Sequence, residues 1–259
     1  MRKIKDAAIE SALAAGSYIK KNIGKIKNIS FKGDTNLVTD IDKTSEAIIV
    51  SHLRKNFPDF SILAEEDHNI QLKNKLKWII DPLDGTVNFA HGFPFFAVSV
   101  GLEDAESGII MGVIYDPMRS ELFFAEKGRG AYLNNKKIRV SKIRDIKKSL
   151  LSTGFAYDSN PLKHKNLGHF TKFLLSAQAI RRSGSAALDL CYVACGRFDG
   201  FWELDLKPWD VAAGRIIVEE AGGKVTKFDG ADFSHYDTEV LASNGLIHSP
   251  MVKVLKLRD

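Results

Sequence analysis

The sequence predicts a mixed α/β fold that contains a largely antiparallel sheet. Residues 2–22 repeat apolar side chains with a period of 3.6 residues, opposite a face of lysines, which indicates an amphipathic helix. Apolar stretches typical of strands then follow one another directly at 95–102, 108–115 and 121–126. Parallel strands would need a long crossover between them, so these strands are expected to form an antiparallel meander.

Three elements are expected before that sheet. The polar stretch at 28–36 predicts a loop. Thr39 followed three residues later by Asp42 is typical of a helix N-terminus, which predicts a helix over 42–57 with Asp42 in its first turn. Residues 60–64 predict a short strand that leads into Glu65.

The second half of the chain predicts shorter strands and helices. Residues 184–196 are rich in small side chains and open at Gly184, so a helix there can pack closely on a sheet. The N-terminus of such a helix can receive anions or hydroxyl oxygens. Pro208 suits the first turn of a further helix that ends at Gly222-Gly223. The remaining expected elements are strands at 149–154, 178–182 and 199–204, a helix near 167–176, and a hairpin turn at Asn134-Asn135.

Composition is that of an ordinary soluble globular protein. The 259 residues are 44% hydrophobic and 27% charged, and they can bury a large core as one domain or two small ones. No apolar run approaches the roughly 20 residues that span a bilayer, and the N-terminus lacks the apolar core of a signal peptide. We therefore expect a cytoplasmic protein that does not bind a membrane.

The two cysteines fit that expectation. Cys191 and Cys195 lie four residues apart on a predicted helix, a geometry that suits a disulfide poorly. With no further cysteine to complete a soft metal site, they are interpreted as buried apolar side chains of a reduced protein.

The net charge of +5 is distributed unevenly. Residues 1–32 carry eight basic and two acidic side chains, and residues 136–148 carry seven basic and one acidic side chain. The remainder of the chain is therefore acidic. Two interpretations stay open: solvated faces that aid solubility, or contact with a polyanion such as RNA.

The main candidate for a functional site in the sequence is residues 78–89, WIIDPLDGTVNF. Trp78-Ile79-Ile80 is typical of a buried strand, and Pro82 with Gly85 indicates that the strand stops and turns at Asp81. Asp81 and Asp84 are then two carboxylates on one tight loop, which repel unless a cation lies between them. Hard oxygen ligands at this spacing favour Mg²⁺.

Two alternatives compete with a metal site at this loop. An Asp-rich turn that caps a helix uses the same residue types. The nucleophilic aspartate of haloacid-dehalogenase phosphatases lies in a D-x-D-G-T motif, but here the acids are three residues apart rather than two. The sequence also lacks G-x-x-x-x-G-K-[ST] and G-x-G-x-x-G, the loops of nucleotide-binding folds.

The stretch WIIDPLDGTVNF at 78–89, taken as a whole, resembles the signature of the inositol monophosphatase family of Mg²⁺-dependent, lithium-sensitive phosphatases. SILAEE at 61–66 and WDVAAGRIIVEEAGG at 209–223 match in the expected order, so the resemblance covers nearly the full chain. It implies a layered α/β/α/β/α sandwich of the type shared with fructose-1,6-bisphosphatase, and a homodimer. It also implies one catalytic domain over 1–259, with a metal-binding half at about 1–145 and a completing half at 146–259.

The resemblance implies two to three Mg²⁺ ions. Asp81 would bridge two of them, and a third, weaker ion would share Glu65. The implied metal ligands are Glu65, the Leu83 carbonyl, Asp81, Asp84 and Asp210. The stretch 28–36 would close over the metals.

Catalytic and substrate roles follow from the same resemblance. Thr86 and Asp42 would orient and deprotonate the attacking water, and Glu65 would share in catalysis through its metal. The implied substrate-binding residues are Gly85, Thr86, Gly184, Ala186, Glu203 and Asp210, with Glu203 accepting hydrogen bonds from ring hydroxyls. Without the resemblance, Glu203 would be interpreted as a surface glutamate at a strand end.

The string DPLDGTVNF resembles inositol monophosphatases in particular, which implies hydrolysis of myo-inositol monophosphate to inositol and phosphate. Relatives that act on fructose 1,6-bisphosphate, histidinol phosphate or a nucleotide 3′-phosphate remain alternatives. WELDLKPWD at 202–210 resembles bacterial members, some of which join transcription antitermination complexes. A second hypothesis is therefore a factor associated with RNA or RNA polymerase.

Overall fold

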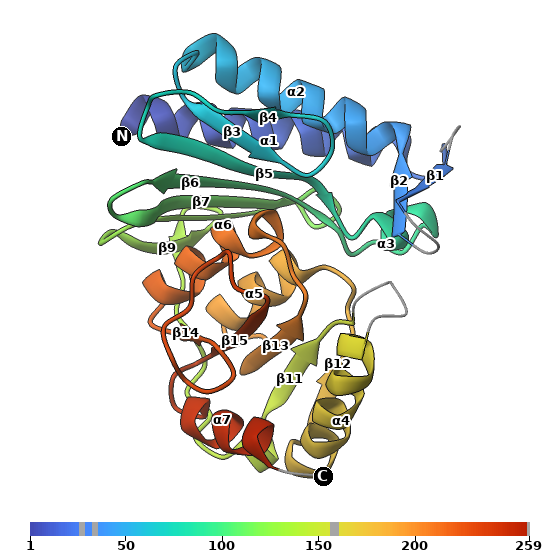
Figure 1. The fold of residues 1–259 in the computed structure, drawn as a ribbon, viewed down its shortest axis with the longest axis vertical. Helices are drawn as coiled ribbons and strands as arrows, with labels where there is room; N and C mark the ends of the chain where they lie inside the picture. The colour runs from blue at the N-terminus through green and yellow to red at the C-terminus, as the bar shows by residue number, and fades with distance from the viewer. Residues whose placement is uncertain (26–28, 33–35, 156–160, 258–259) are drawn as a thin grey trace.

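The computed structural model describes residues 1–25, 29–32, 36–155 and 161–257. Its helices and sheets form five alternating layers (Figure 1). Helices α1 (Arg2–Asn22) and α2 (Asp40–Asn56) cover one face of the first sheet, and α5 (Ala186–Ala194) and α6 (Pro208–Glu220) lie between the two sheets. Helices α4 (Pro161–Ser176) and α7 (His248–Lys256) cover the outer face of the second sheet. The predicted α/β/α/β/α sandwich is confirmed.

The first sheet has eight strands in the order β10-β9-β8-β7-β6-β5-β3-β4. Strands β5 to β10 pair antiparallel in succession, as the meander predicted, and β3 runs parallel to β5. The strands are β3 (Ser61–Ala64), β4 (Asn69–Ile70), β5 (Leu76–Asp84), β6 (Ala97–Asp104), β7 (Gly108–Asp116), β8 (Glu121–Glu126), β9 (Gly130–Leu133) and β10 (Lys136–Lys137).

The second sheet has five strands in the order β12-β11-β13-β15-β14. Strand β11 runs parallel to β12 and β13, and β15 runs antiparallel to β13 and β14. The strands are β11 (Leu150–Thr153), β12 (Ala179–Arg181), β13 (Gly200–Leu204), β14 (Lys224–Thr226) and β15 (Glu239–Ser243). Strands β11, β12 and β13 were predicted from the sequence, whereas β14, β15 and α7 were not.

The segment before α2 differs from the expected loop. Strands β1 (Ile29–Lys32) and β2 (Asn36–Thr39) form an antiparallel pair, so the loop predicted at 28–36 is wrong for those residues. Residues 28 and 33–35 lie outside the described part, and closure of this segment over metals stays a prediction. The predicted start of α2 is confirmed, because Thr39 Oγ1 accepts from Ile41 N at 3.1 Å and Thr39 N donates to Asp42 Oδ2 at 2.8 Å.

Strand β5 is buried on both faces, as its continuous apolar run predicts. Trp78 and Ile80 pack in the cluster under α1 and α2, whereas Ile79 packs in the cluster around α5 and α6. The helix α6 approaches the sheet so closely that a Cβ on Gly112 would lie only 2.8 Å from Ala213 Cα. Glycine at this position allows the approach. Strand β7 and α6 therefore pack with their backbones in close contact.

Two smaller expectations can be compared directly. Cys191 is buried, Cys195 is partly buried, and neither forms a disulfide. Among the helices in the described residues, none combines the length and apolarity needed to cross a bilayer.

Candidate active site

The two aspartates of the central motif lie on β5 itself rather than on a turn after it. The strand continues to Asp84, and its pairing with β6 shifts register between Asp81 and Asp84. Asp81 pairs with Ser99 and Asp84 with Ala97, so three steps on β5 oppose two steps on β6. Side chains three apart on a regular strand point to opposite faces, and one extra residue returns them to the same face. The expected stop at Asp81 is therefore replaced by a β-bulge.

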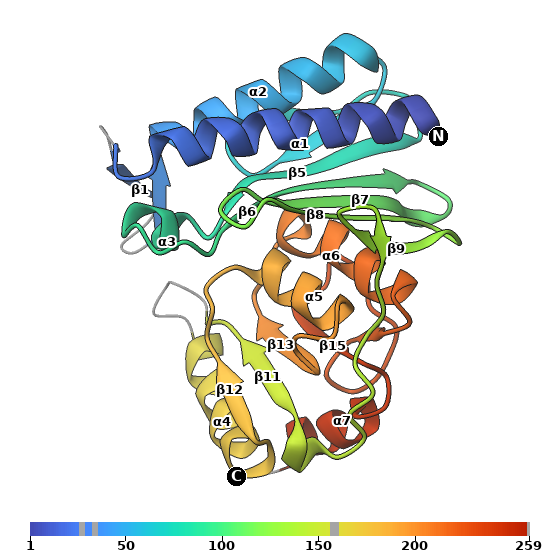
Figure 2. The same cartoon turned by 180° about the vertical axis from the view of Figure 1, so that it is seen from behind.

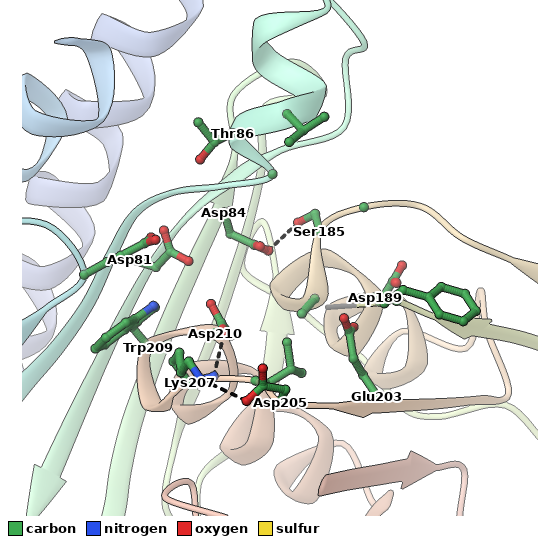
Figure 3. A pocket seen from close by; sticks show the side chains of 18 of the residues that line it. Asp81, Asp84, Thr86, Ser185, Asp189, Glu203, Asp205, Lys207, Trp209 and Asp210 are labelled. Carbon is green, nitrogen blue, oxygen red and sulfur yellow. Dashed lines mark hydrogen bonds and ion pairs between the residues drawn. The ribbon is translucent and has the colours of Figure 1, made fainter. Parts of the chain in front are cut away.

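A third carboxylate joins this pair from a distant segment. Asp210 is the third residue of α6, and Lys207 N donates to its Oδ2 at 2.6 Å. One ligand oxygen each of Asp81, Asp84 and Asp210 can be chosen so that all lie within 4.8 Å of one another. Figure 3 shows the three carboxylates around one space. All their donor atoms are hard oxygens, which is the ligand set that Mg²⁺ and Ca²⁺ prefer.

The electrostatics of this cluster favour a bound cation. Burial raises the pKa of Asp81 well above its usual value, with the Glu65 charge as the next cause. Burial also raises the pKa of Asp84 to about 6. Burial together with the Asp84 charge raises the pKa of Asp210 to about 7. Carboxylates that resist ionisation in this way can all be charged at neutral pH when a divalent cation compensates them.

Glu65 approaches the same cluster from the neighbouring strand. Strand β3 pairs in parallel with β5, with Ala64 opposite Ile80, and Glu65 N donates to Ile80 O at 3.2 Å. Strand β3 therefore ends beside Ile80, which places Glu65 next to Asp81, although β5 itself continues to Asp84. Glu65 lines the same pocket as Asp81 but is not part of the tight group of three carboxylates.

The turn after β5 is held by Thr86. Its Oγ1 lies 2.9 Å from Asp42 Oδ1 and 3.0 Å from Leu83 O, so it links α2 to the end of the strand. Burial raises the pKa of Asp42, against the hydrogen bonds from Thr39 and Thr86 that lower it. Asp42 is not among the pocket-lining residues, and it contacts the site through Thr86.

Gly85 supplies the backbone conformation that this turn requires. Its φ of 95° lies in the left-handed region, and a Cβ would lie 3.0 Å from Phe95 O. The next residue, Thr86, begins the short helix α3 (Thr86–Ala90).

The N-terminus of α5 faces the same pocket, with Gly184 and Ala186 both among its lining residues. Ser185 Oγ donates to Asp84 Oδ2 at 2.5 Å, and Ala187 N donates to the same oxygen at 2.7 Å. In this structure the predicted anion-receiving helix N-terminus therefore receives a protein carboxylate.

Glu203 is the penultimate residue of β13, and it lines the pocket rather than the surface. It is 8% exposed, so the surface interpretation is wrong. Burial raises its pKa well above the usual value, and the Asp189 charge is the next cause. Both carboxylates lie beside the group of three acids in Figure 3.

The pocket has a volume of about 300 Å³ and contains every predicted site residue except Asp42. Several lining residues escaped the sequence analysis, namely Arg182, Ser185, Asp189, Asp205, Lys207 and Trp209. Ser185 carried a usable signal, because serine before an apolar helix is typical of an N-cap, and it caps α5 here. Asp205, Lys207 and Trp209 also carried a signal, because they lie between or beside Glu203 and Asp210 in the stretch WELDLKPWD. Arg182 and Asp189 carry no local pattern of this kind.

Comparison with known proteins defines the class. A solved structure of extragenic suppressor protein suhB from Bartonella henselae matches with a TM-score of 0.94 and 39% identity, covering 98% of each chain. An inositol-1-monophosphatase from Synechocystis sp. is 45% identical over 252 residues, covering 96% of this chain and 88% of the relative. The Nus factor SuhB of Vibrio cholerae is 44% identical over 252 residues, covering 94% of this chain and 92% of the relative.

The layered fold and the acidic pocket, together with these relatives, define a phosphatase of the α/β sandwich class. The chain belongs to the inositol monophosphatase family, whose family model matches residues 1–256. The resemblance noted in the sequence is confirmed at that level.

Proposed function

We propose that this protein hydrolyses a phosphate monoester, myo-inositol monophosphate, with Mg²⁺ as cofactor. The observation that carries the proposal is the convergence of Asp81, Asp84 and Asp210 in a pocket that also contains Glu203. The acids can hold a cation beside the phosphate, and Glu203 can hold the hydroxylated ring of the substrate.

The residues proposed to hold Mg²⁺ are Glu65, Asp81, the Leu83 carbonyl, Asp84 and Asp210. Their fit rests on the all-oxygen donor set and on the raised pKa values of Asp81, Asp84 and Asp210. Bound there, Mg²⁺ would neutralise phosphate charge and lower the pKa of a water molecule. Two to three ions is the number that the resemblance implies, and it stays a prediction.

The protein's own groups act on the phosphate and on the water. The Gly85 and Thr86 amides are proposed to bind phosphate oxygens at the start of α3. Thr86 Oγ1 would orient the attacking water, and its contact with Asp42 offers a path for the proton. Burial raises the pKa of Asp42, which is the direction that favours a carboxylate as proton acceptor.

Substrate choice is assigned to the opposite side of the pocket. Glu203 is proposed to accept hydrogen bonds from ring hydroxyls, with Gly184 and Ala186 contacting the substrate at the start of α5. Fructose 1,6-bisphosphate, histidinol phosphate and a nucleotide 3′-phosphate are the alternative substrates, because they present the same phosphate with a different leaving group.

A substrate panel tests the proposal. Purified protein with saturating Mg²⁺ should release phosphate from myo-inositol monophosphate with the highest kcat/KM among sugar, cyclitol and nucleotide phosphates. Lithium should inhibit the turnover. If one of the three alternative substrates has a higher kcat/KM, that compound replaces myo-inositol monophosphate as the proposed substrate. Absence of turnover on the whole panel would overturn the proposal.

RNA contact is the second candidate function. Residues 136–148 comprise β10 and most of the connection to β11, which runs along one side of the molecule (Figure 2). All seven of their basic side chains are exposed. Exposed cations on one extended segment suit the backbone phosphates of a nucleic acid. This surface lies outside the pocket, so it is compatible with phosphatase activity.

A homodimer and a cytoplasmic location are proposed on the family resemblance. Sedimentation equilibrium measures the first, and cell fractionation measures the second. A monomer across micromolar concentrations would contradict the dimer.

A further inference from the structure

A buried glutamate outside the pocket holds the segment that carries Glu65. Glu46 lies on α2, and its side chain is 1% exposed. Its Oε2 accepts from Glu66 N at 2.8 Å, and its Oε1 accepts from Asp67 N at 2.8 Å and His68 N at 3.0 Å. The His68 ring adds Nδ1 at 2.7 Å from Oε1. Three consecutive backbone N–H groups therefore converge on one carboxylate, as in an anion-binding nest.

Glu65 directly precedes this nest. Toward β5, Glu65 N donates a hydrogen bond to Ile80 O, and the preceding residue, Ala64, donates from its N to His68 O at 3.0 Å. The backbone of Glu65 is thus fixed between β5 and the turn that Glu46 holds. A buried carboxylate compensated by several N–H donors resists displacement, because each broken bond would leave a buried charge unsatisfied.

The same helix also contacts the other metal-ligand segment. Ser45 Oγ donates to Pro82 O at 2.8 Å inside the β5 bulge, and Asp42 contacts Thr86 just beyond it. Successive residues of α2 therefore hold the ends of both β3 and β5. Glu46 is the one that acts on the Glu65 side.

We propose that Glu46 is a positioning residue for the metal site: it fixes the turn at 66–68 so that Glu65 is held beside Asp81. The inference rests on the proposed function, because it assumes that Glu65 is a metal ligand. Groups that orient metal ligands contribute roughly 10–100-fold to metal affinity. Loss of the Glu46 carboxylate should weaken metal binding without removing any ligand.

Isothermal titration of the purified full-length protein with Mg²⁺, without substrate, measures the effect. Glu46→Gln puts an amide donor against the backbone N–H groups, and we expect the dissociation constant for Mg²⁺ to rise about tenfold or more. Glu46→Asp keeps the charge but withdraws the carboxylate by one methylene, so it should shift the constant in the same direction. It also serves as the second variant where Glu46→Gln does not fold.

Asp104→Asn is the matched control. Asp104 is a buried carboxylate that likewise accepts from successive backbone amides, Glu106 N and Ser107 N, but at the opposite end of β6 from the site. The metal affinity of this variant should stay within about twofold of the wild type, because Asp104 holds no ligand segment. Amide hydrogen exchange of 66–68 should accelerate in Glu46→Gln and not in Asp104→Asn.

The possible results separate the positioning role from the proposed function. Mg²⁺ binding by the wild type, with equal binding by both Glu46 variants, would overturn the positioning role and leave the proposed function intact. Equal losses of Mg²⁺ affinity in Glu46→Gln and Asp104→Asn would also overturn the positioning role, because a general loss of stability would then explain the weaker binding. Absence of Mg²⁺ binding by the wild type would overturn the proposed function, and the positioning role would fall with it.

Discussion

Ser185 donates its hydroxyl to Asp84 Oδ2 at 2.5 Å, across 101 positions of sequence. Asp84 belongs to β5 in the first sheet, whereas Ser185 caps α5 between the sheets. The backbone of this acid is therefore set by one part of the chain and the orientation of its side chain by another. The site exists only when both parts are folded together.

The acid cluster gives the first prediction. Asp81→Asn and Asp84→Asn should each remove nearly all phosphatase activity, because each replaces a charged oxygen of the proposed metal site by a neutral amide. The loss of kcat/KM should exceed the roughly 10–100-fold typical of residues that only orient ligands. Circular dichroism should show a retained fold, since both variants remove repulsion between acids. Normal turnover by Asp81→Asn would refute the mechanism.

The pH dependence of stability gives the second prediction. The folded pKa values of about 6 for Asp84 and about 7 for Asp210 lie above 3.8, the value expected in the unfolded chain. Between these values the folded protein binds more protons than the unfolded one, so these groups lower the free energy of unfolding as pH rises from about 4 to 7. His248 acts in the opposite direction, because burial lowers its pKa to about 4.

Comparison of variants isolates this contribution. In EDTA, the melting temperature of Asp210→Asn should exceed that of the wild type by more at about pH 7.5 than at about pH 5, where only part of the destabilisation is present. A difference of about 1 kcal/mol corresponds to roughly 2–4 °C in a protein of this size, which thermal unfolding resolves. Mg²⁺ at the higher pH should stabilise the wild type more than the variant. The same gain at both pH values would mean that Asp210 does not titrate in this range.

Glu203 gives the third prediction. Loss of a hydrogen bond to a charged acceptor costs roughly 1.5–3 kcal/mol, so Glu203→Ala should lower kcat/KM for myo-inositol monophosphate by about ten- to a hundredfold. The loss should be much smaller with p-nitrophenyl phosphate, which has no ring hydroxyl. Glu203→Gln keeps one acceptor oxygen and should fall between the wild type and Glu203→Ala. Equal losses on both substrates would point to a disturbed metal site, and no loss on either would exclude a role for Glu203.

The basic segment gives the fourth prediction. Substitution of Lys136, Lys137 and Arg139 by alanine should leave kcat/KM unchanged, because all three side chains are exposed and none lines the pocket. If the wild type binds single-stranded RNA, the log–log slope of affinity against salt should fall by about 0.7 for each phosphate that the variant no longer neutralises. Fluorescence anisotropy with labelled RNA measures this slope. Absence of binding at low salt would remove the RNA candidate.

Local patterns predicted the helix starts on which two site residues lie, whereas the roles of those residues came from the family resemblance. Asp42 and Asp210 are each the third residue of a helix, where an acid bonds the N-cap amide, and that arrangement has a recognisable spacing. The strand ending in Asp81 was recognised from three apolar residues. The bulge was not, because Pro82 and Gly85 indicate a turn as readily as a strand with an extra residue.

Other features depend on long-range packing that no local pattern encodes. Asp189 is a plain acidic position on a small-residue helix, and it lies beside Glu203 only after α5 and β13 have packed. Glu46 likewise resembles a solvent-facing helical residue until its partners at 66–68 are known. By contrast, residues 29–32, ISFK, and 36–39, NLVT, pair with each other as strands. Their apolar and β-branched side chains favour strands, but the prediction of a loop followed the polar residues that lie beside them.

The bulge in β5 makes the site sensitive to chain length in a way that composition does not reveal. Deleting Leu83 would remove the surplus residue and leave Asp84 two steps from Asp81 on a regular strand, where both side chains still lie on the same face. That change would remove the proposed carbonyl ligand rather than turn a carboxylate away. Inserting a residue would instead turn Asp84 toward the opposite face. The orientation of the two carboxylates is therefore compatible with one residue fewer between them but not with one residue more, because an added residue reverses the face on which Asp84 lies.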